Sequence, residues 1–262
     1  SISNISGRNI EQASQMNLTQ ALQGKLPGLV VNNRGGIPGS DDATILIRGQ
    51  STLGNNSPLI IIDGIPRPSF AHLSPNDVES ISVLKDAAAA IYGAQAANGV
   101  IIIKTKRGKI GESEIRLSSN YGISSFTQLP KYMDAFQYAT WENEIADRYG
   151  RVRQWSDEDL QKYQDGSSPL THPNTDFYDE VFREWAPYTH HNLSASGGSE
   201  KVQYFISGDY LNQGGLYESK DLKYDQYQIR SNIDAQVTDA LQLGFDLSGR
   251  LEKQHSTSTA VT

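Results

Sequence analysis

Hydrophobic residues follow two different patterns along the chain, and the change falls near residue 108. Before it, three apolar runs of strand length are each bounded by turn residues: 59–62, 81–84 and 100–103. Such continuous runs are typical of strands that are buried on both faces. After it, apolar and polar residues alternate, as in strands with one apolar and one polar face. The sequence therefore predicts an α+β domain at 1–108, followed by antiparallel β-structure at 109–262.

The residues that bound the three runs predict how they are connected. These turn formers are Asp63, Gly64, Pro66, Gly93, Asn98 and Gly99. Asp-Gly and Asn-Gly pairs favour tight turns, and Pro cannot donate to a strand ladder. We therefore expect a turn after the first run, with Asp63 capping its own turn, and a strand end at Pro66. Residues 87–90 predict a short helical turn that ends at Gly93.

The segment before the first apolar run has weaker signals. Residues 1–16 are polar and weakly patterned, and Asn17 predicts the N-cap of a helix over 18–24. The stretch 29–31 predicts a short strand, which we place in the same sheet as the three runs. The glycine-rich stretch 34–39 lacks the lysine and the following helix of a phosphate-binding loop, so it predicts a flexible loop.

A motif through these elements resembles the plug domain of TonB-dependent outer-membrane receptors, and most closely their SusC/RagA branch. It starts at Ile45-Leu-Ile-Arg-Gly49, continues through Pro58-Leu-Ile-Ile-Ile-Asp-Gly-Ile-Pro66 and ends with residues 78–108. The resemblance implies a small mixed sheet with short helices that fills a transmembrane β-barrel. It also marks a set of structural motif residues: Gly49, Asp63, Gly64, Pro66, Tyr92, Gly93, Asn98 and Gly99.

The resemblance also implies how the plug is held in the barrel. In the family, the arginine of the Ile-Arg-Gly motif is held by carboxylates of the inner barrel wall, which makes Arg48 a candidate plug–barrel lock; a buried arginine needs such a partner. The alternative is a surface arginine without a special role. Ile91 stands where many receptors of the wider class carry a second arginine, so a two-arginine lock is not expected. Glu79, Lys85 and Asp86 are further candidates for plug-internal or plug-to-wall pairs.

Five segments after residue 108 alternate between apolar and polar residues: 114–124, 188–197, 201–212, 226–237 and 241–252. Each is close to the length that a tilted strand needs to cross hydrocarbon. A soluble β-sandwich also alternates. However, polar residues such as Arg230 and Asn232 share one face, and an unbroken apolar face lies opposite, which favours a water-filled lumen inside and lipid outside. We therefore predict the N-terminal part of a transmembrane β-barrel.

The connections between these segments alternate between short and long. Residues 197–200 and 238–240 predict tight periplasmic turns, and 125–187 and 213–223 predict longer extracellular segments. A plugged transporter barrel needs about 22 strands. We therefore expect this chain to be a fragment with a truncated barrel, and any TonB box to lie upstream of it.

The insertion at 125–187 predicts two helices, at 135–149 and 156–163. Packing of the insertion's own core is the expected use of its tryptophans, and stacking on a ligand or contact with a partner is the alternative. The resemblance also directs the plug loops toward the extracellular cavity. The candidate ligand or partner contacts are Arg34, Asn55, Asn56, Trp141 and Trp155.

Composition excludes several other functions. The net charge of −7 gives no electrostatic support for binding nucleic acid. The absence of cysteine excludes disulfides, thiolate metal sites and cysteine nucleophiles. His172, His190 and His191 lack the helical spacing of metal ligands, and no carboxylate pair stands in a recognisable acid–base setting. We therefore expect no enzyme, no cofactor, no metal and no transmembrane helix, since no run of 18 apolar residues occurs.

The resemblance implies a transporter in the bacterial outer membrane that imports an oligosaccharide or a peptide. It implies two protein partners, the TonB energy-coupling complex on the periplasmic side and a SusD-like surface lipoprotein. One alternative is a secreted or surface β-rich protein that binds or adheres to a ligand without transport, which would leave residues 45–108 unexplained. Another is an enzyme such as a glycosidase.

Overall fold

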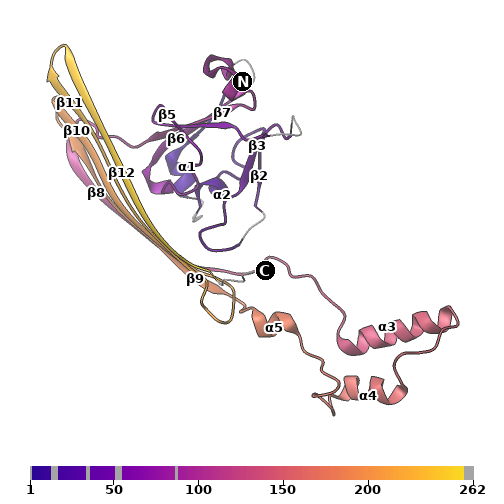
Figure 1. Cartoon of the computed structure of the whole chain (residues 1–262). Coiled ribbons are helices and arrows are strands. Elements are labelled where there is room, and N and C mark those ends of the chain that lie inside the picture. Colours follow the sequence, from indigo (N-terminus) through magenta and orange to yellow (C-terminus); the bar gives the residue numbers. More distant parts are fainter. Residues whose placement is uncertain (1, 13–16, 34–35, 51–54, 86–87, 257–262) are drawn as a thin grey trace. The chain divides into compact units, whose positions relative to one another are not determined.

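The computed structural model describes residues 2–12, 17–33, 36–50, 55–85 and 88–256 (Figure 1). The chain divides into two compact units. The first contains residues 1–123, 187–215 and 221–262, and the second contains 124–186 and 216–220. The first unit holds a small α/β domain, which we call the plug, and a sheet of long strands, which we call the wall.

The core of the plug is a five-stranded mixed sheet with the strand order β1-β6-β7-β4-β5. Its strands are β1 (Ile2–Ser6), β4 (Leu59–Ile62), β5 (Ile65–Arg67), β6 (Val78–Leu84) and β7 (Val100–Thr105). Strands β4 and β7 are parallel, and the other neighbouring pairs are antiparallel. All three predicted apolar runs are confirmed as strands, and they lie inside the sheet because Ile81, Ile101 and Ile103 are fully buried.

Short helices cover this sheet. Helix α1 (Gly7–Glu11) contributes Ile10 to the core, and α2 (Leu18–Ala21) contributes Leu18. The Asn17 side chain accepts a hydrogen bond from the Thr19 amide, as an N-cap should. The predicted cap is confirmed, although α2 ends three residues earlier than expected.

Several plug elements differ from the sequence-based predictions. Residues 2–11 form β1 and α1 although their sequence is weakly patterned. Strand β2 (Leu29–Asn32) pairs with β3 (Thr44–Ile47) in a separate two-stranded sheet, so its placement in the main sheet was wrong. Pro66 lies within β5 rather than ending a strand. Proline is tolerated there because β5 is the edge of the sheet, where a residue without an amide hydrogen costs no hydrogen bond between strands.

Glycines at positive φ form the turns of the plug. Asp63 and Gly64 adopt φ of 48° and 83°, which suits the tight hairpin turn between β4 and β5. Gly93, with φ of 73°, ends the 3₁₀ helix Ala90–Tyr92, so the expected helical turn lies about two residues later; residue 87 lies outside the described residues. A second 3₁₀ helix spans Ala94–Ala96. The turn before Gly99 is confirmed.

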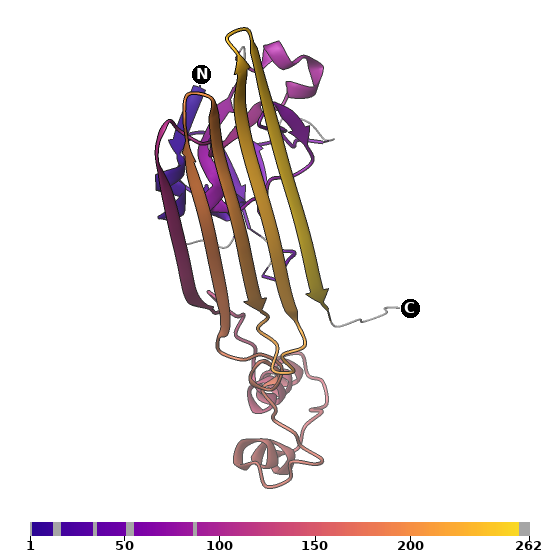
Figure 2. The ribbon, with the colours of Figure 1, turned by 90° about the vertical axis from the view of Figure 1, so that its left-hand side faces the viewer.

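The wall has the strand order β12-β11-β10-β9-β8. Its members are β8 (Gly111–Ser124), β9 (Ala186–Gly198), β10 (Val202–Gly214), β11 (Lys223–Thr238) and β12 (Leu241–His255). Neighbours from β9 to β12 are antiparallel. All five predicted alternating segments are strands, and the plug lies against one face of their sheet (Figure 2).

The wall differs from a sheet of a soluble protein, because polar side chains are buried on one face and apolar side chains are exposed on the other. On β11, Asn232 is 0% exposed and Arg230 is 8% exposed, whereas Ile229 is 59% exposed. On β8, Ile115 and Leu117 are likewise exposed. On β11 the alternation therefore buries the polar side chains and exposes the apolar ones, and on β10 the buried face carries Ser207 and Asp209 together with two apolar residues, Phe205 and Leu211.

The second unit is helical. It contains α3 (Ala135–Arg148), α4 (Asp157–Asp165) and α5 (Phe177–Val181). Both predicted helices are confirmed; Asp134 and Ser156 begin them with capping boxes. Helix α5 was not predicted, and its neighbour Phe182 packs against the rings of Phe126 and Tyr217. Among the helices of the described residues, none is long and apolar enough to cross a membrane.

Candidate functional site

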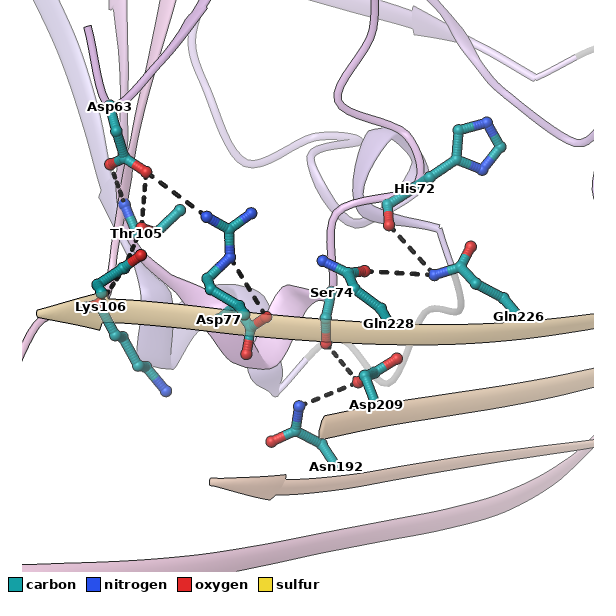
Figure 3. Close-up of polar contacts among 12 residues, drawn as sticks. Asp63, His72, Ser74, Asp77, Thr105, Lys106, Asn192, Asp209, Gln226 and Gln228 are labelled. Carbon is teal, nitrogen blue, oxygen red and sulfur yellow. Dashed lines mark hydrogen bonds and ion pairs between the residues drawn. The ribbon is translucent and has the colours of Figure 1, made fainter. Parts of the chain in front are cut away.

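The candidate site is the interface where the polar face of the wall meets the plug. Figure 3 shows that side chains from both sides converge on it, from β9, β10 and β11 of the wall and from the plug around the 3₁₀ helix Pro75–Asp77. Buried polar groups need hydrogen-bond partners. The geometry of the interface therefore shows how firmly each part of the plug is held.

The first group of contacts centres on one wall carboxylate, Asp209 of β10. Its Oδ2 atom accepts hydrogen bonds from Ser74 Oγ of the plug at 2.6 Å and from Asn192 Nδ2 at 3.0 Å. His190 Nε2 lies 2.8 Å from the same oxygen. All four side chains are buried. Ser74 bonds to the carboxylate rather than to the imidazole, so the contacts are those of a structural anchor and not of a histidine-activated nucleophile.

Amide side chains of the wall also hold plug loops through the backbone. Gln226 Nε2 of β11 donates to the carbonyl oxygen of His72 at 3.2 Å, and Gln254 Nε2 of β12 donates to the carbonyl oxygen of Pro38 at 2.9 Å. These bonds do not depend on the plug side chains, so they fix the position of the loops without selecting their sequence.

The second group centres on Arg230 of β11 and is loosely paired. Arg230 Nη1 lies 3.7 Å from Asp63 Oδ2, and Nε lies 3.6 Å from Asp77 Oδ2. Asp63 also accepts hydrogen bonds from Thr105 N at 2.9 Å and from Thr105 Oγ1 at 2.7 Å. The Asp63 side chain therefore caps the end of β7 and faces the wall, which differs from the expectation that it caps its own turn.

Asp77 is the least satisfied group of the interface. It is 0% exposed, and neither carboxylate oxygen has a hydrogen-bond partner among the described residues. Arg230 Nε, Ser207 Oγ and Asn232 Oδ1 are also buried without such a partner. Burial raises the pKa of Asp77 above its ordinary value, and the nearby Ser207 and Arg230 only partly oppose this.

The third group holds the C-terminal end of the plug, and we call it the Arg107 clamp. Arg107 Nη1 donates to both oxygens of Asp234 at 3.0 and 3.1 Å, and Nη2 donates to Asp246 Oδ2 at 2.6 Å. Asn232 Nδ2 donates to the carbonyl oxygen of Lys106 at 2.7 Å. Gly108 lies so close to the wall that a Cβ atom there would come within 2.2 Å of the Tyr204 amide nitrogen. The clamp therefore joins plug and wall by hydrogen bonds that run directly from one to the other.

The lock candidates from the sequence lie elsewhere. Arg48 is exposed at the end of β3 with φ of 61°, and its amide donates to the carbonyl oxygen of Gly28. Lys85 is buried; its Nζ donates to the carbonyl oxygen of Pro27 and to Ser3 Oγ, both in the plug. Glu79 is exposed on β6, and Asp86 lies outside the described residues. The lock role of these residues stays a prediction.

The structural motif residues serve the backbone of the plug. Gly49 and Gly99 adopt φ of 92° and 90°, where other residues are strained. A Cβ atom on Gly99 would come within 2.6 Å of the Ile47 side chain. Asn98 Nδ2 donates to the carbonyl oxygen of Asn55, which joins two plug loops. Tyr92 is exposed at the end of its 3₁₀ helix.

The structure separates the candidate ligand contacts. Asn56 is half-buried, and Trp141 is exposed on α3. Trp155 Nε1 donates to Glu142 Oε2 at 2.8 Å, and its ring packs against Tyr163, so it takes part in the insertion's own packing. Arg34 lies outside the described residues.

Comparison with known proteins agrees with this geometry. Residues 1–100 match the TonB-dependent Receptor Plug Domain family. TonB-dependent receptor P26 of Formosa agariphila is 32% identical over 94% of this chain and 24% of its own length. TonB-dependent receptor SusC of Bacteroides thetaiotaomicron is 34% identical over 79% of this chain and 20% of its own length.

Solved structures extend the likeness to the arrangement of the elements. A chain of the RagAB peptide importer in its closed-closed state has a TM-score of 0.79 and 28% identity, covering 99% of this chain and 31% of its own length. The siderophore receptor PirA from Acinetobacter baumannii shares the fold, with a TM-score of 0.60 and 17% identity over 95% of this chain and 31% of its own length.

A plug of this form, seated on the polar face of antiparallel strands, defines the plug domain and part of the barrel of a TonB-dependent receptor, a class of outer-membrane proteins. The chain spans about a fifth to a quarter of the length of the curated relatives and about a third of the matched importer chain. Within this class the chain belongs to the SusC/RagA type.

The raised pKa of Asp77 predicts how the seating of the plug depends on pH. Because burial raises its pKa, the Asp77 carboxyl binds a proton more tightly in the seated plug than in a separated plug. Separation should therefore become easier as the pH rises from the ordinary value of 3.8 through the raised pKa, and harder on acidification. Urea titration of the purified full-length receptor at mildly acidic and at neutral pH measures this difference. Asp77→Asn should reduce it, and an equal pH dependence in both proteins would contradict the assignment.

Proposed function

We propose that the full-length protein is a TonB-dependent, SusC-like transporter that imports a nutrient across the outer membrane. The observation that carries this proposal is the seated plug. Buried polar contacts hold it against the inner face of strands whose outer face is apolar. An apolar outer face suits lipid, and a polar inner face suits a lumen. A plugged lumen that opens on demand is the arrangement of a gated transporter.

The substrate class that we propose is an oligosaccharide or a peptide. RagAB is a peptide importer, and the chain resembles it over almost its whole length. The SusC branch of the resemblance supports an oligosaccharide. We propose Arg34, Asn55, Asn56 and Trp141 as the residues of this chain that contact the ligand or a partner.

Two partners complete the proposal. The TonB energy-coupling complex supplies the work that moves the plug, from the periplasmic side. A SusD-like surface lipoprotein covers the barrel from outside, and the exposed aromatic side chains of the insertion suit such an interface. We also propose that Arg48 pairs with carboxylates of barrel strands that are not part of this chain, and so holds the plug in the barrel. A surface adhesin is the alternative function, but it has no need of a plug in its lumen.

Uptake separates these two functions. Cells that lack the protein should fail to accumulate a labelled oligosaccharide or peptide from a defined panel, and complemented cells should accumulate it. Inactivation of TonB should abolish accumulation but leave surface binding. If the complemented cells bind a ligand without any TonB-dependent entry, the adhesin alternative is correct and transport is not.

The sidedness of β12 predicts a difference between two neighbouring substitutions. Leu247 is 49% exposed on the apolar outer face, and Ser248 pairs with Arg230 of β11 and therefore shares its inner face. Arginine facing lipid near the bilayer midplane costs about 2–4 kcal/mol. Leu247→Arg should therefore lower the folding yield of the full-length protein in bilayers more than Ser248→Arg. Equal yields would count against the proposed lipid face.

The alternation of short and long connections predicts topology. The first strand after a periplasmic plug should run outward, so the insertion and the 216–220 loop should lie outside the cell and the β9–β10 turn inside. Ser167→Cys and Ser219→Cys should react with a membrane-impermeant maleimide on intact cells, and Ser199→Cys should not. This chain has no cysteine of its own to react. Labelling of Ser199→Cys alone would show that the topology is inverted.

A further inference from the structure

We propose that Arg230 is the wall residue that positions the plug, and that its loose pairing makes this contact the releasable part of the seat. Arg230 projects from β11 toward two plug carboxylates, Asp63 of the β4–β5 turn and Asp77 of the 3₁₀ helix before β6. The positive charge that holds Asp63 of the Asp-Gly motif therefore belongs to the wall, and the negative charge belongs to the plug. In a lock of the kind expected for Arg48, the positive charge belongs to the plug and the carboxylates to the wall.

The burial of Arg230 makes it a positioning residue rather than a surface charge. It is 8% exposed, and Asp77 is 0% exposed. Removing one partner of a buried ion pair leaves the other charge uncompensated at a large cost in stability. Without the guanidinium, the buried Asp77 would lose its opposite charge and keep the like charge of Asp209 nearby, so the seated plug would be disfavoured.

The distances show why this contact can also release. The Arg107 clamp consists of direct hydrogen bonds between 2.6 and 3.1 Å, with one nitrogen bonded to both oxygens of a carboxylate. Arg230 reaches its two carboxylates only at 3.6 and 3.7 Å, and its Nε has no hydrogen-bond partner among the described residues. Ion pairs without hydrogen bonds attract, but they lack the short-range energy of the clamp.

The two plug carboxylates also differ in what separation does to them. Asp63 keeps its bonds to Thr105, because both residues belong to the plug. The Asp77 oxygens have no hydrogen-bond partner among the described residues, and separation would bring them into water, which relieves the penalty of their burial. Arg230 therefore guides the plug into place by charge, and at this contact no short ion-pair hydrogen bond to Asp63 or Asp77 has to be broken before the plug moves.

This inference deepens the proposed function, because it names a contact that opens before a substrate can pass the plug. It is tested without any substrate, so a failure of the inference and a failure of the transport proposal are distinguishable. The measurement is the potassium conductance of the purified full-length receptor in planar bilayers, at a low urea concentration that leaves the wild-type protein closed. Resistance of the folded barrel to SDS on unheated gels shows that each variant is assembled.

Arg230→Gln should raise the open fraction at least tenfold, and Arg230→Lys should restore most of the closed state. The matched control is Arg250→Gln on β12, because Arg250 pairs with Glu252 of its own strand, and this variant should stay closed. Adding Asp77→Asn to Arg230→Gln should close the channel again, since it removes the uncompensated charge. A merely structural role for Arg230 would not allow this rescue.

Two results would overturn the proposal. One is an assembled Arg230→Gln receptor with the wild-type open fraction. The other is an open Arg230→Gln receptor that Asp77→Asn fails to close. If Arg230→Gln does not assemble, assembly itself becomes the measurement: the double variant with Asp77→Asn should recover it, and failure to recover would overturn the proposal equally.

Discussion

The first unit depends on one constraint: a long sheet whose polar face is buried. Side chains such as Asn192, Asp209 and Asn232 cannot be buried against an apolar surface without losing their hydrogen bonds. The plug supplies such bonds to Asp209 through Ser74 and to Asn232 through the Lys106 carbonyl oxygen, while Asn192 donates to Asp209 within the wall. The wall and the plug are thus each other's polar partners, and the apolar side chains that form the interior of most proteins lie on the outer surface of the wall.

This arrangement makes the seat of the plug strong at one point and weak at another. The clamp at Arg107 combines short hydrogen bonds with a close backbone approach at Gly108. The contact at Arg230 depends on charge across a longer distance, beside the buried Asp77 carboxylate, for which the described part of the chain offers no hydrogen-bond partner. A domain that must stay in place and yet move needs both kinds of contact, since uniformly strong pairing would prevent release.

The long strands were predictable because their period is local: each side chain faces opposite to the next, whichever strands lie beside it. The interior strands of the plug were predictable from apolar runs for a similar reason. Strand β1 was not, because its sequence has little pattern and it is a strand only through pairing with β6, where Ile5 lies opposite Ile81. The separate sheet of β2 and β3 was missed for the same reason, since no local pattern determines a strand's partner.

For this protein, the sequence by itself determined the type of each unit, the inverted faces of the wall and the family motif of the plug. The tertiary structure decided which charges meet. An aspartate in a polar loop, such as Asp77, looks like any surface residue until β11 brings Arg230 beside it from 153 positions further along the chain. Periodicity is a property of neighbouring residues, whereas an ion pair across an interface depends on how two separately folded elements dock.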